Sequence, residues 1–355
     1  MVRRAVRRPF ATVVLVVRDA ETHIVRALES VLNQDFDDIQ VVVSDRASHD
    51  RTCSMCRNIA EREIRLDVVE NDSSDFSQAF DAAIAAARGK YVLPMAQDDW
   101  LAPGSLAKLA DAVKSHDLQL AIMALSLDEQ VGTGERASHV LRFSVEPTDS
   151  AAAFRDETPL FVREGVLGFL KAKLFDRDRI DELGLRMSLQ GSQTAFLMSY
   201  IESVTCAGCV EEALYHVTLG EAGQTETTTY LERERDHERM LELARAWHRE
   251  HDGELMRAIH QLHMRQVIAS IEQVCSLRGI SSIERSERVR DIVEAPSTRA
   301  SIEVLGETSR EFGFMYASIV RKNVAGCCLS ARFAQLARIS RLPIAHGGVD
   351  LVALA

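Results

Sequence analysis

The chain has 355 residues, with 53 acidic side chains against 42 lysines and arginines, and a formal net charge of −11 at pH 7. That length suffices for one large domain or two of ordinary size, and the apolar and charged fractions exclude a disordered chain. An acidic protein of this kind is not expected to bind nucleic acid non-specifically. It can still bind a nucleotide whose phosphates are held by a metal ion or by backbone amides.

The N-terminal segment MVRRAVRRPFATVVLVV imitates a signal peptide. Its apolar run is short and β-branched, no small-residue cleavage site follows, and a charged pair closes it, so we expect a first core strand and a cytoplasmic protein. No apolar run reaches the roughly 20 residues that a membrane helix needs.

Seven cysteines, an odd number, do not predict a disulfide framework. The pairs Cys53/Cys56 and Cys206/Cys209 have the spacing of zinc ligands, but they lie far apart and lack the turn glycines of a zinc knuckle. We expect these cysteines to be small core residues instead.

The first third of the chain alternates strand and helix patterns. Apolar, β-branched runs predict strands at 11–17, 39–45, 65–71 and 90–95. Apolar residues at helical spacing follow each run, which predicts a parallel sheet covered by helices on both faces. Ligands of such sheets lie beyond the carboxyl ends of the strands, where this chain places Asp19, Asp45, Asp98 and Asp99. Carboxylates gathered at one edge repel one another unless a cation or a donor group lies between them.

From about residue 118 the pattern changes. Strand-like runs are expected at 118–127, 139–145 and 204–218, with a short helix ending the segment 165–184 and a further helix at 192–203. Beyond about residue 225 the sequence is predominantly helical and charged, so we expect one domain over 1–225 and a helical region over 226–355.

Three segments in the first 115 residues carry a family resemblance: VVLVVRDAETHIVRALESVLNQDFDDIQVVVSDRASHDRT, then EN…FSQAFDAAIAAARGKYV, then AQDDWLAPGSLAKL. In order and spacing they resemble the family 2 glycosyltransferases of the GT-A fold, closely over about 10–115 and loosely over 155–230. The resemblance implies an α/β fold with a mostly parallel sheet flanked by helices. It also implies a nucleotide-binding half at about 10–115 and an acceptor half at about 116–225.

The resemblance implies an inverting hexosyltransferase of polysaccharide biosynthesis. Its donor would be a nucleoside-diphosphate sugar, UDP type first, and its acceptor a hydroxyl of a glycan or of a lipid-linked cell-envelope precursor. By the same resemblance Asp45 binds the nucleobase. Three further side chains stand at other nucleotide-binding positions: Arg18, Asp19 and Asp81.

The resemblance makes Asp98 the last acid of the family's DxD motif, followed by Asp99, and makes His216 of EEALYHVT a further metal ligand. These three would hold Mg²⁺ or Mn²⁺, a hard ion that prefers carboxylate oxygens and neutralises a departing diphosphate. The alternative is that the two aspartates cap the following helix and that His216 is a half-buried strand residue.

The sequence departs from the family at positions that matter. Ala96 replaces the first DxD acid, and Ser192 and Gln193 replace the acids of the GED motif that in many members supplies the general base. Neither Ser192 nor Gln193 can act as a base near neutral pH. The remaining acids are weak candidates, for which a solvated face or a helix cap is the alternative: Asp176, Asp178 and Glu164.

Two other functions stay open. One is a catalytically impaired relative that serves as a nucleotide-binding or scaffold partner. The other is a nucleotidyltransferase, which would normally show a glycine-rich loop after the first strand, where this chain has VVRDAETH.

The C-terminal segment 321–341 surrounds an apolar stripe with basic side chains. Such a helix can pack on its own domain with its arginines in water, or lie on an anionic membrane, which would place the protein at the inner face of that membrane. The basic residues are Arg321, Lys322, Arg332, Arg338 and Arg341.

Overall fold

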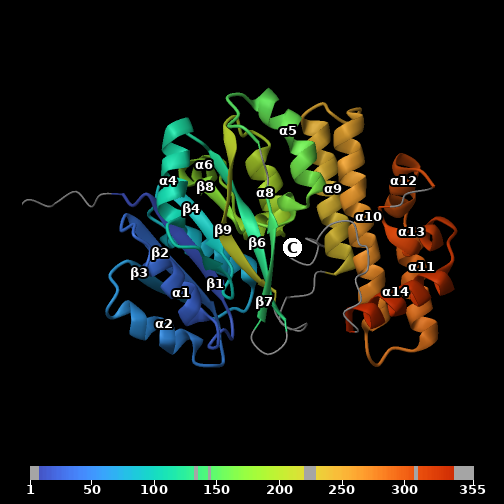
Figure 1. The fold of residues 1–355 in the computed structure, drawn as a ribbon, viewed down its shortest axis with the longest axis horizontal. Coiled ribbons are helices and arrows are strands. Elements are labelled where there is room, and N and C mark those ends of the chain that lie inside the picture. Colours follow the sequence, from blue (N-terminus) through green and yellow to red (C-terminus); the bar gives the residue numbers. More distant parts are fainter. Residues whose placement is uncertain (1–7, 132–134, 143–144, 220–228, 308–310, 340–355) are drawn as a thin grey trace, which may run out of the picture. The chain divides into compact units, whose positions relative to one another are not determined.

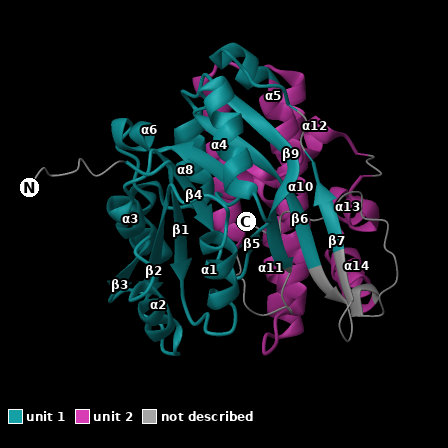
Figure 2. Ribbon diagram, turned by 60° about the vertical axis from the view of Figure 1, so that its left-hand side comes forward, with its two compact units in different colours: residues 1–156, 170–225 teal, residues 157–169, 226–355 magenta. Residues whose placement is uncertain are grey.

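The computed structural model describes residues 8–131, 135–142, 145–219, 229–307 and 311–339 (Figure 1). The chain divides into two compact units, which Figure 2 colours separately. Unit 1 comprises Met1–Asp156 and Leu170–Thr225, and unit 2 comprises Glu157–Phe169 and Glu226–Ala355. The α/β class predicted from the sequence is confirmed, since unit 1 carries a mixed sheet flanked by helices and unit 2 is helical.

The strands of unit 1 form one sheet. In chain order they are β1 (Ala11–Val17), β2 (Ile39–Arg46), β3 (Leu66–Asn71), β4 (Tyr91–Met95), β5 (Trp100–Leu101), β6 (Leu120–Val131), β7 (Glu135–Leu141), β8 (Lys173–Asp176) and β9 (Ala207–Leu219). Across the described part of the sheet the order is β3-β2-β1-β4-β8-β6-β9-β5, and β7 pairs with β6. Strands β1 to β4 are parallel, β8 enters antiparallel between β4 and β6, and β5 pairs antiparallel with β9.

The helices follow the strands along the chain. Before residue 226 they are α1 (Ile24–Leu32), α2 (Thr52–Ala60), α3 (Phe76–Ala86), α4 (Ser105–His116), α5 (Ala151–Arg163), α6 (Arg177–Glu182), α7 (Met187–Gln190) and α8 (Gln193–Ile201). After it they are α9 (Tyr230–Ala246), α10 (Gly253–Ser276), α11 (Ser282–Glu294), α12 (Pro296–Leu305), α13 (Gly313–Val320) and α14 (Val324–Ile339).

The first half of the sheet follows from the sequence pattern. Every residue of β2 is buried, as a strand covered on both faces requires. Helix α1 buries Ile24, Ala27, Leu28 and Val31, which lie on one face at helical spacing. Right-handed crossovers then place α1 and α3 on opposite sides of β1 and β2, as Figure 2 shows.

The chain changes direction across the sheet between β1 and β4. The links from β1 to β3 run one way, and the link from β3 to β4 runs back past β1. At the start of β4, Gly89 lies so close to β1 that a β-carbon would stand 2.4 Å from the amide nitrogen of Thr12. In α/β sheets a ligand binds beyond the carboxyl ends of the strands at such a reversal. Here these are the ends of β1 and β4, and we call the region beyond them the crevice.

Unit 2 is organised around α10. Its core gathers apolar side chains from α10 to α14, among them Met264, Val267, Ile271, Val289, Ile292, Met315, Tyr316 and Ile319. Over the described residues, no helix is both long enough and apolar enough to cross a membrane.

Candidate functional site at the carboxyl edge of the sheet

The ends of β1 and β4 are joined by a side chain. The backbone N–H of Arg18 donates to Gln97 Oε1 over 2.8 Å, and Gln97 Nε2 donates to the carbonyl of Arg18 over 3.2 Å. Asp19 follows with a left-handed backbone, φ +47°, and its carboxylate accepts the N–H of His49 over 2.7 Å. Arg18 and Asp19 therefore lie together at this edge, as the sequence predicts.

The loop after β2 fixes Asp45. This aspartate is only 4% exposed, and its carboxylate accepts the N–H of Ser48 over 3.0 Å and the Ser48 hydroxyl over 2.5 Å. Asn71 at the end of β3 donates to the Asp45 carbonyl over 2.8 Å. Asp45 thus holds one orientation, at the carboxyl end of the strand next to β1.

The adjacent acids Asp98 and Asp99 point to different environments. Asp99 is 1% exposed, and its carboxylate accepts the Tyr215 hydroxyl over 2.8 Å and the N–H of Thr218 over 3.2 Å. Lys171 Nζ lies 3.5 Å away. Burial raises the pKa of Asp99, the Lys171 charge opposes that rise, and the like charge of Asp98 adds to it. Asp99 therefore joins the end of β4 to β9 from inside the protein.

Asp98 is half-buried and is held through its main chain. Arg26 of α1 donates from one guanidinium nitrogen to the carbonyl of Asp98 and to the Thr218 hydroxyl, the latter over 2.8 Å. Among the described residues, no hydrogen bond or ion pair engages the Asp98 carboxylate. Its backbone is thus fixed between α1 and β9 while its side chain stays available to a ligand.

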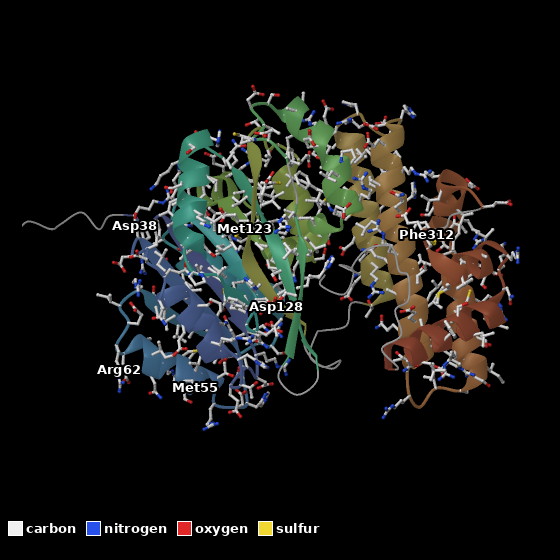
Figure 3. All side chains as sticks on the ribbon, in the orientation of Figure 1. Asp38, Met55, Arg62, Met123, Asp128 and Phe312 are labelled. Atoms are coloured by element: carbon white, nitrogen blue, oxygen red, sulfur yellow. The ribbon has the colours of Figure 1, made fainter. Side chains whose placement is uncertain are left out.

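His216 lies on β9 directly across from Trp100 of β5, and the two rings stack with centroids 3.6 Å apart. Its Nδ1 lies 2.9 Å from Asp128, which Figure 3 labels on β6. Burial alone would raise the pKa of Asp128, but hydrogen bonds from Ser126, Ser138 and His216 hold it below the ordinary value. Because Asp128 occupies Nδ1, the nitrogen left for a ligand is Nε2.

The weak candidates Asp176 and Asp178 lie away from the edge that carries Asp98. Asp176 pairs with Tyr91, the first residue of β4, and so stands at the amino end of that strand, opposite the edge that carries Asp98. Asp178 makes a two-pronged ion pair with Arg8, over 2.7 and 2.8 Å. The antiparallel direction of β8 carries both acids away from the crevice.

Two other predicted residues have structural partners. The Asp81 carboxylate accepts the N–H groups of Met187 and Ser188, over 2.6 and 3.0 Å, and the Ser188 hydroxyl, over 2.5 Å. It therefore caps the start of α7 from α3. Glu164 belongs to unit 2 and pairs with the neighbouring Arg163 over 3.4 Å.

The start of α8 carries no acid, as the sequence indicates. The hydroxyl of Ser192 caps the helix by accepting the N–H of Ala195 over 3.0 Å. The side-chain oxygen Oε1 of Gln193 accepts the N–H of Leu170 over 3.4 Å. Both side chains serve the local fold.

Four side chains around the crevice were not foreseen: Arg26, Gln97, Lys171 and Asp128. Gln97 offered a signal, because it stands between Ala96 and Asp98 in the DxD-like motif. The others act across elements that are distant in the sequence, and no local pattern marks them.

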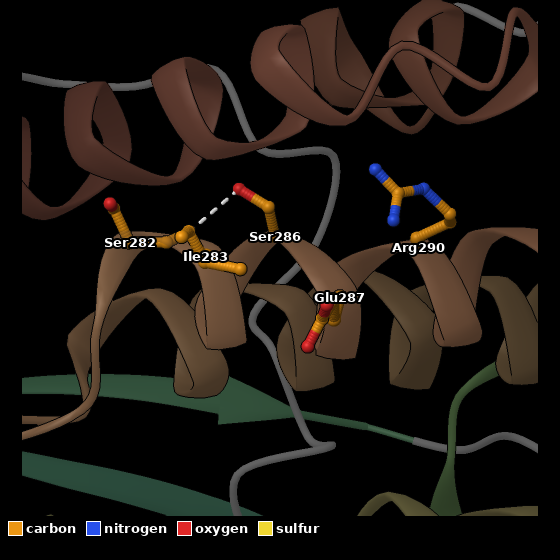
Figure 4. Close-up of a pocket in the computed structure, with 5 residues that line it drawn as sticks. All are labelled: Ser282, Ile283, Ser286, Glu287 and Arg290. Atoms are coloured by element: carbon orange, nitrogen blue, oxygen red, sulfur yellow. Dashed lines mark hydrogen bonds between the residues drawn. The ribbon is translucent and has the colours of Figure 1, made fainter.

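The described residues hold no group of three or more His, Cys, Asp or Glu side chains arranged to bind a metal ion. A hollow of about 440 Å³ over α11 is lined by five residues of that one helix, shown in Figure 4. Its walls bring no polar groups together from different elements, so we do not assign it as a binding site.

Comparison with known sequences supports the sequence resemblance. Residues 12–177 match the model of "Glycosyl transferase family 2". The succinoglycan biosynthesis protein ExoO of Rhizobium meliloti is 26% identical over 219 residues, which are 60% of this chain and 62% of ExoO. The O-antigen biosynthesis protein RfbC of Myxococcus xanthus is 30% identical over 229 residues, 62% of this chain and 17% of RfbC. The chain thus spans less than two thirds of the length of these relatives.

Solved structures share the fold. A crystal structure of Staphylococcus aureus TarS 1–349 in complex with UDP-GlcNAc superposes with a TM-score of 0.61 at 15% identity, covering 92% of this chain and 91% of that one. A second crystal structure of TarS 1–349 gives a TM-score of 0.59 at 13% identity, with the same coverage. Residues 12–177 therefore form a glycosyl transferase family 2 region, and the chain shares the fold of TarS 1–349.

Proposed function

We propose that the chain is a metal-assisted, inverting hexosyltransferase of polysaccharide biosynthesis. One observation carries the proposal: the Asp98 carboxylate, without a partner among the described residues, stands in the crevice that the strand order creates. UDP-sugars are the first donors to consider, because TarS has the same fold and was crystallised with UDP-GlcNAc. A glycan or lipid-linked acceptor agrees with the names of ExoO, a succinoglycan biosynthesis protein, and of RfbC, an O-antigen biosynthesis protein.

In this proposal a divalent ion would take two ligands from the protein. Asp98 would offer a carboxylate oxygen to Mg²⁺ or Mn²⁺ and His216 would offer Nε2, with the remaining positions left to phosphate oxygens and water. The ion, when bound, would neutralise the charge of the departing diphosphate. We propose that Asp99 is not a ligand, because Tyr215 and Thr218 already bind its buried carboxylate.

The nucleotide would lie across the ends of β1 and β2. Hydrogen bonds from Ser48 orient the Asp45 carboxylate, which would accept a hydrogen bond from the nucleobase. The guanidinium of Arg18 would stack on that nucleobase. Asp19 beside Arg18 completes this side of the crevice. Asp81 drops out of the proposed nucleotide site because it caps α7.

Transfer with inversion needs a general base, and the positions at the start of α8 where the resemblance predicts that base carry no acid. The acceptor hydroxyl attacks the anomeric carbon, the bond from that carbon to the diphosphate oxygen breaks, and the hydroxyl proton must leave. At the start of α8, Ser192 and Gln193 cannot take that proton at neutral pH. This observation favours a second candidate function, a nucleotide-binding partner that does not transfer sugar.

Calorimetric titration separates the proposals. UDP, GDP and dTDP are titrated with and without Mn²⁺ into the wild type, Asp98→Asn and the control Asp111→Asn, which alters an exposed acid of α4. We expect Mn²⁺-dependent binding of one nucleotide, weakened at least about tenfold by Asp98→Asn alone, as for loss of a charged ligand. Nucleotide affinity that changes neither with Mn²⁺ nor with Asp98→Asn would contradict the metal site. Metal-dependent binding with no sugar released or transferred from the matching donor would support the second function.

A further inference from the structure

Helix α14 in unit 2 is apolar on two opposite faces. One face packs in the core of unit 2 through Cys327 and Ala331, which are 0% and 3% exposed. On the other face Leu329, Phe333 and Leu336 are 70%, 61% and 61% exposed. These three recur at helical spacing, so they form one stripe where a surface helix normally carries polar side chains. A contiguous exposed stripe of this kind marks an interaction site.

The charge around the stripe is one-sided. From Phe312 to Val349 the sequence contains five lysines and arginines and no aspartate or glutamate, in a chain whose net charge is −11. Arg332 lies three residues after Leu329 and four before Leu336, so it borders the stripe.

The other basic residues extend the same segment. Arg321 and Lys322 are exposed in the turn that leads into α14, and no ion pair engages either of them or Arg332 among the described residues. Arg338 belongs to α14, but its side chain is not described, and Arg341 lies outside the described residues.

We propose that this α14 surface, meaning Leu329, Phe333 and Leu336 with Arg321, Lys322 and Arg332, lies on an anionic phospholipid bilayer. The apolar stripe would enter the boundary between headgroups and acyl chains, while the basic side chains would contact lipid phosphates. A second copy of the chain fits less well, because a two-fold contact through the stripe would bring the basic residues of both copies together. The proposal goes beyond the sugar-transfer reaction and does not depend on it.

Vesicle co-sedimentation of the full chain tests the proposal. We expect the protein to sediment with vesicles of equal parts phosphatidylcholine and phosphatidylglycerol, but not with phosphatidylcholine alone, and to be released by added salt. Replacing Arg321, Lys322 and Arg332 by Gln should lower binding about a hundredfold, at roughly fivefold or ~1 kcal/mol for each basic residue.

The stripe is tested by the pair Leu329→Gln and Phe333→Gln, with Ile283→Gln as the matched control. Ile283 is 70% exposed on α11, so its replacement removes one exposed apolar side chain elsewhere in unit 2. The stripe variant should lose vesicle binding while the control retains it, and both should keep the wild-type circular dichroism and nucleotide binding. Failure of the wild type to bind the mixed vesicles would overturn the proposal. So would a stripe variant that still binds vesicles but changes the molecular mass measured by light scattering.

Discussion

Replacing Asp128 by Asn tests whether the β6–β9 pair prepares His216 for a metal ion. The substitution keeps the shape of the side chain but removes the charge that faces His216 Nδ1 at 2.9 Å. Hydrogen bonds to a charged group contribute about 1.5–3 kcal/mol, and solvent screens this one little, since the two side chains are 9% and 17% exposed. Loss of such an outer partner typically lowers metal affinity about 10- to 100-fold, which is roughly 1.4–2.8 kcal/mol.

Two measurements separate the roles of Asp128. Mn²⁺ is titrated in the presence of UDP, and unfolding is followed in denaturant. Both measurements are made for Asp128→Asn and for the control Ser138→Ala, which removes one hydrogen bond from an uncharged donor to the same carboxylate. We expect Asp128→Asn to weaken Mn²⁺ binding at least about tenfold and Ser138→Ala to leave it nearly unchanged. Because the pKa of Asp128 is lowered in the folded state, its stabilising effect exists above the unfolded pKa and is lost as the pH falls. The stability difference between wild type and Asp128→Asn should therefore shrink in acid. Reduced stability with unchanged Mn²⁺ affinity would refute the assignment of His216 as a ligand.

Three further predictions concern the crevice and the two units. Arg26→Met should lower nucleotide affinity by about tenfold, because it removes the hydrogen bonds that hold the main chain of Asp98, the proposed metal ligand. Wild-type affinity of this variant in calorimetry would contradict the prediction. Gly89→Ala should cost about 3 kcal/mol of unfolding free energy in urea, because a β-carbon there meets the backbone of Thr12 at 2.4 Å, and a neutral effect would mean that the strands can separate. Burial, with neighbouring histidine charges adding to it, lowers the pKa of His237 to about 2 and of His260 to about 4. The unfolded chain binds these protons below about pH 6.5, so stability should fall by about 1.4 kcal/mol per pH unit for each histidine down to about pH 4; a flat profile over that range would contradict the burial of both rings.

The first four strands of the sheet were largely predictable from local sequence. Strands β1 to β4 lie within a residue or so of the predicted runs. In β2 and β4, where every residue is buried, a nearly continuous apolar run marks the strand. The carboxylates that end these runs mark the edge of the sheet without any knowledge of the tertiary structure. Asp45 and Asp98 could be placed at that edge for the same reason.

The rest of the sheet could not be predicted in this way. Strand β8 has four residues and β5 has two, too few for a pattern to show, and the direction of β8 depends on pairing with β4 and β6. That direction places Asp176 beside the first residue of β4, at the end of the strand opposite Asp98. Strand β7 also lies earlier than predicted, at Glu135–Leu141 instead of 139–145, because it pairs with the far end of β6.

The resemblance predicts an acid at position 96, and its substitution by alanine can be related to the hydrogen bonds around this position. The N–H of Ala96 donates to the Tyr215 hydroxyl over 3.1 Å, and that hydroxyl donates to Asp99 over 2.8 Å. These two bonds hold the main chain of Ala96 and the side chain of Asp99, and Arg26 holds the carbonyl of Asp98 between them. The geometry of the loop therefore does not depend on an acid at position 96. What the substitution removes is one negative charge, so a cation bound here would gain less from the protein alone and more from the donor's phosphates, and metal and nucleotide should bind together more strongly than either does separately.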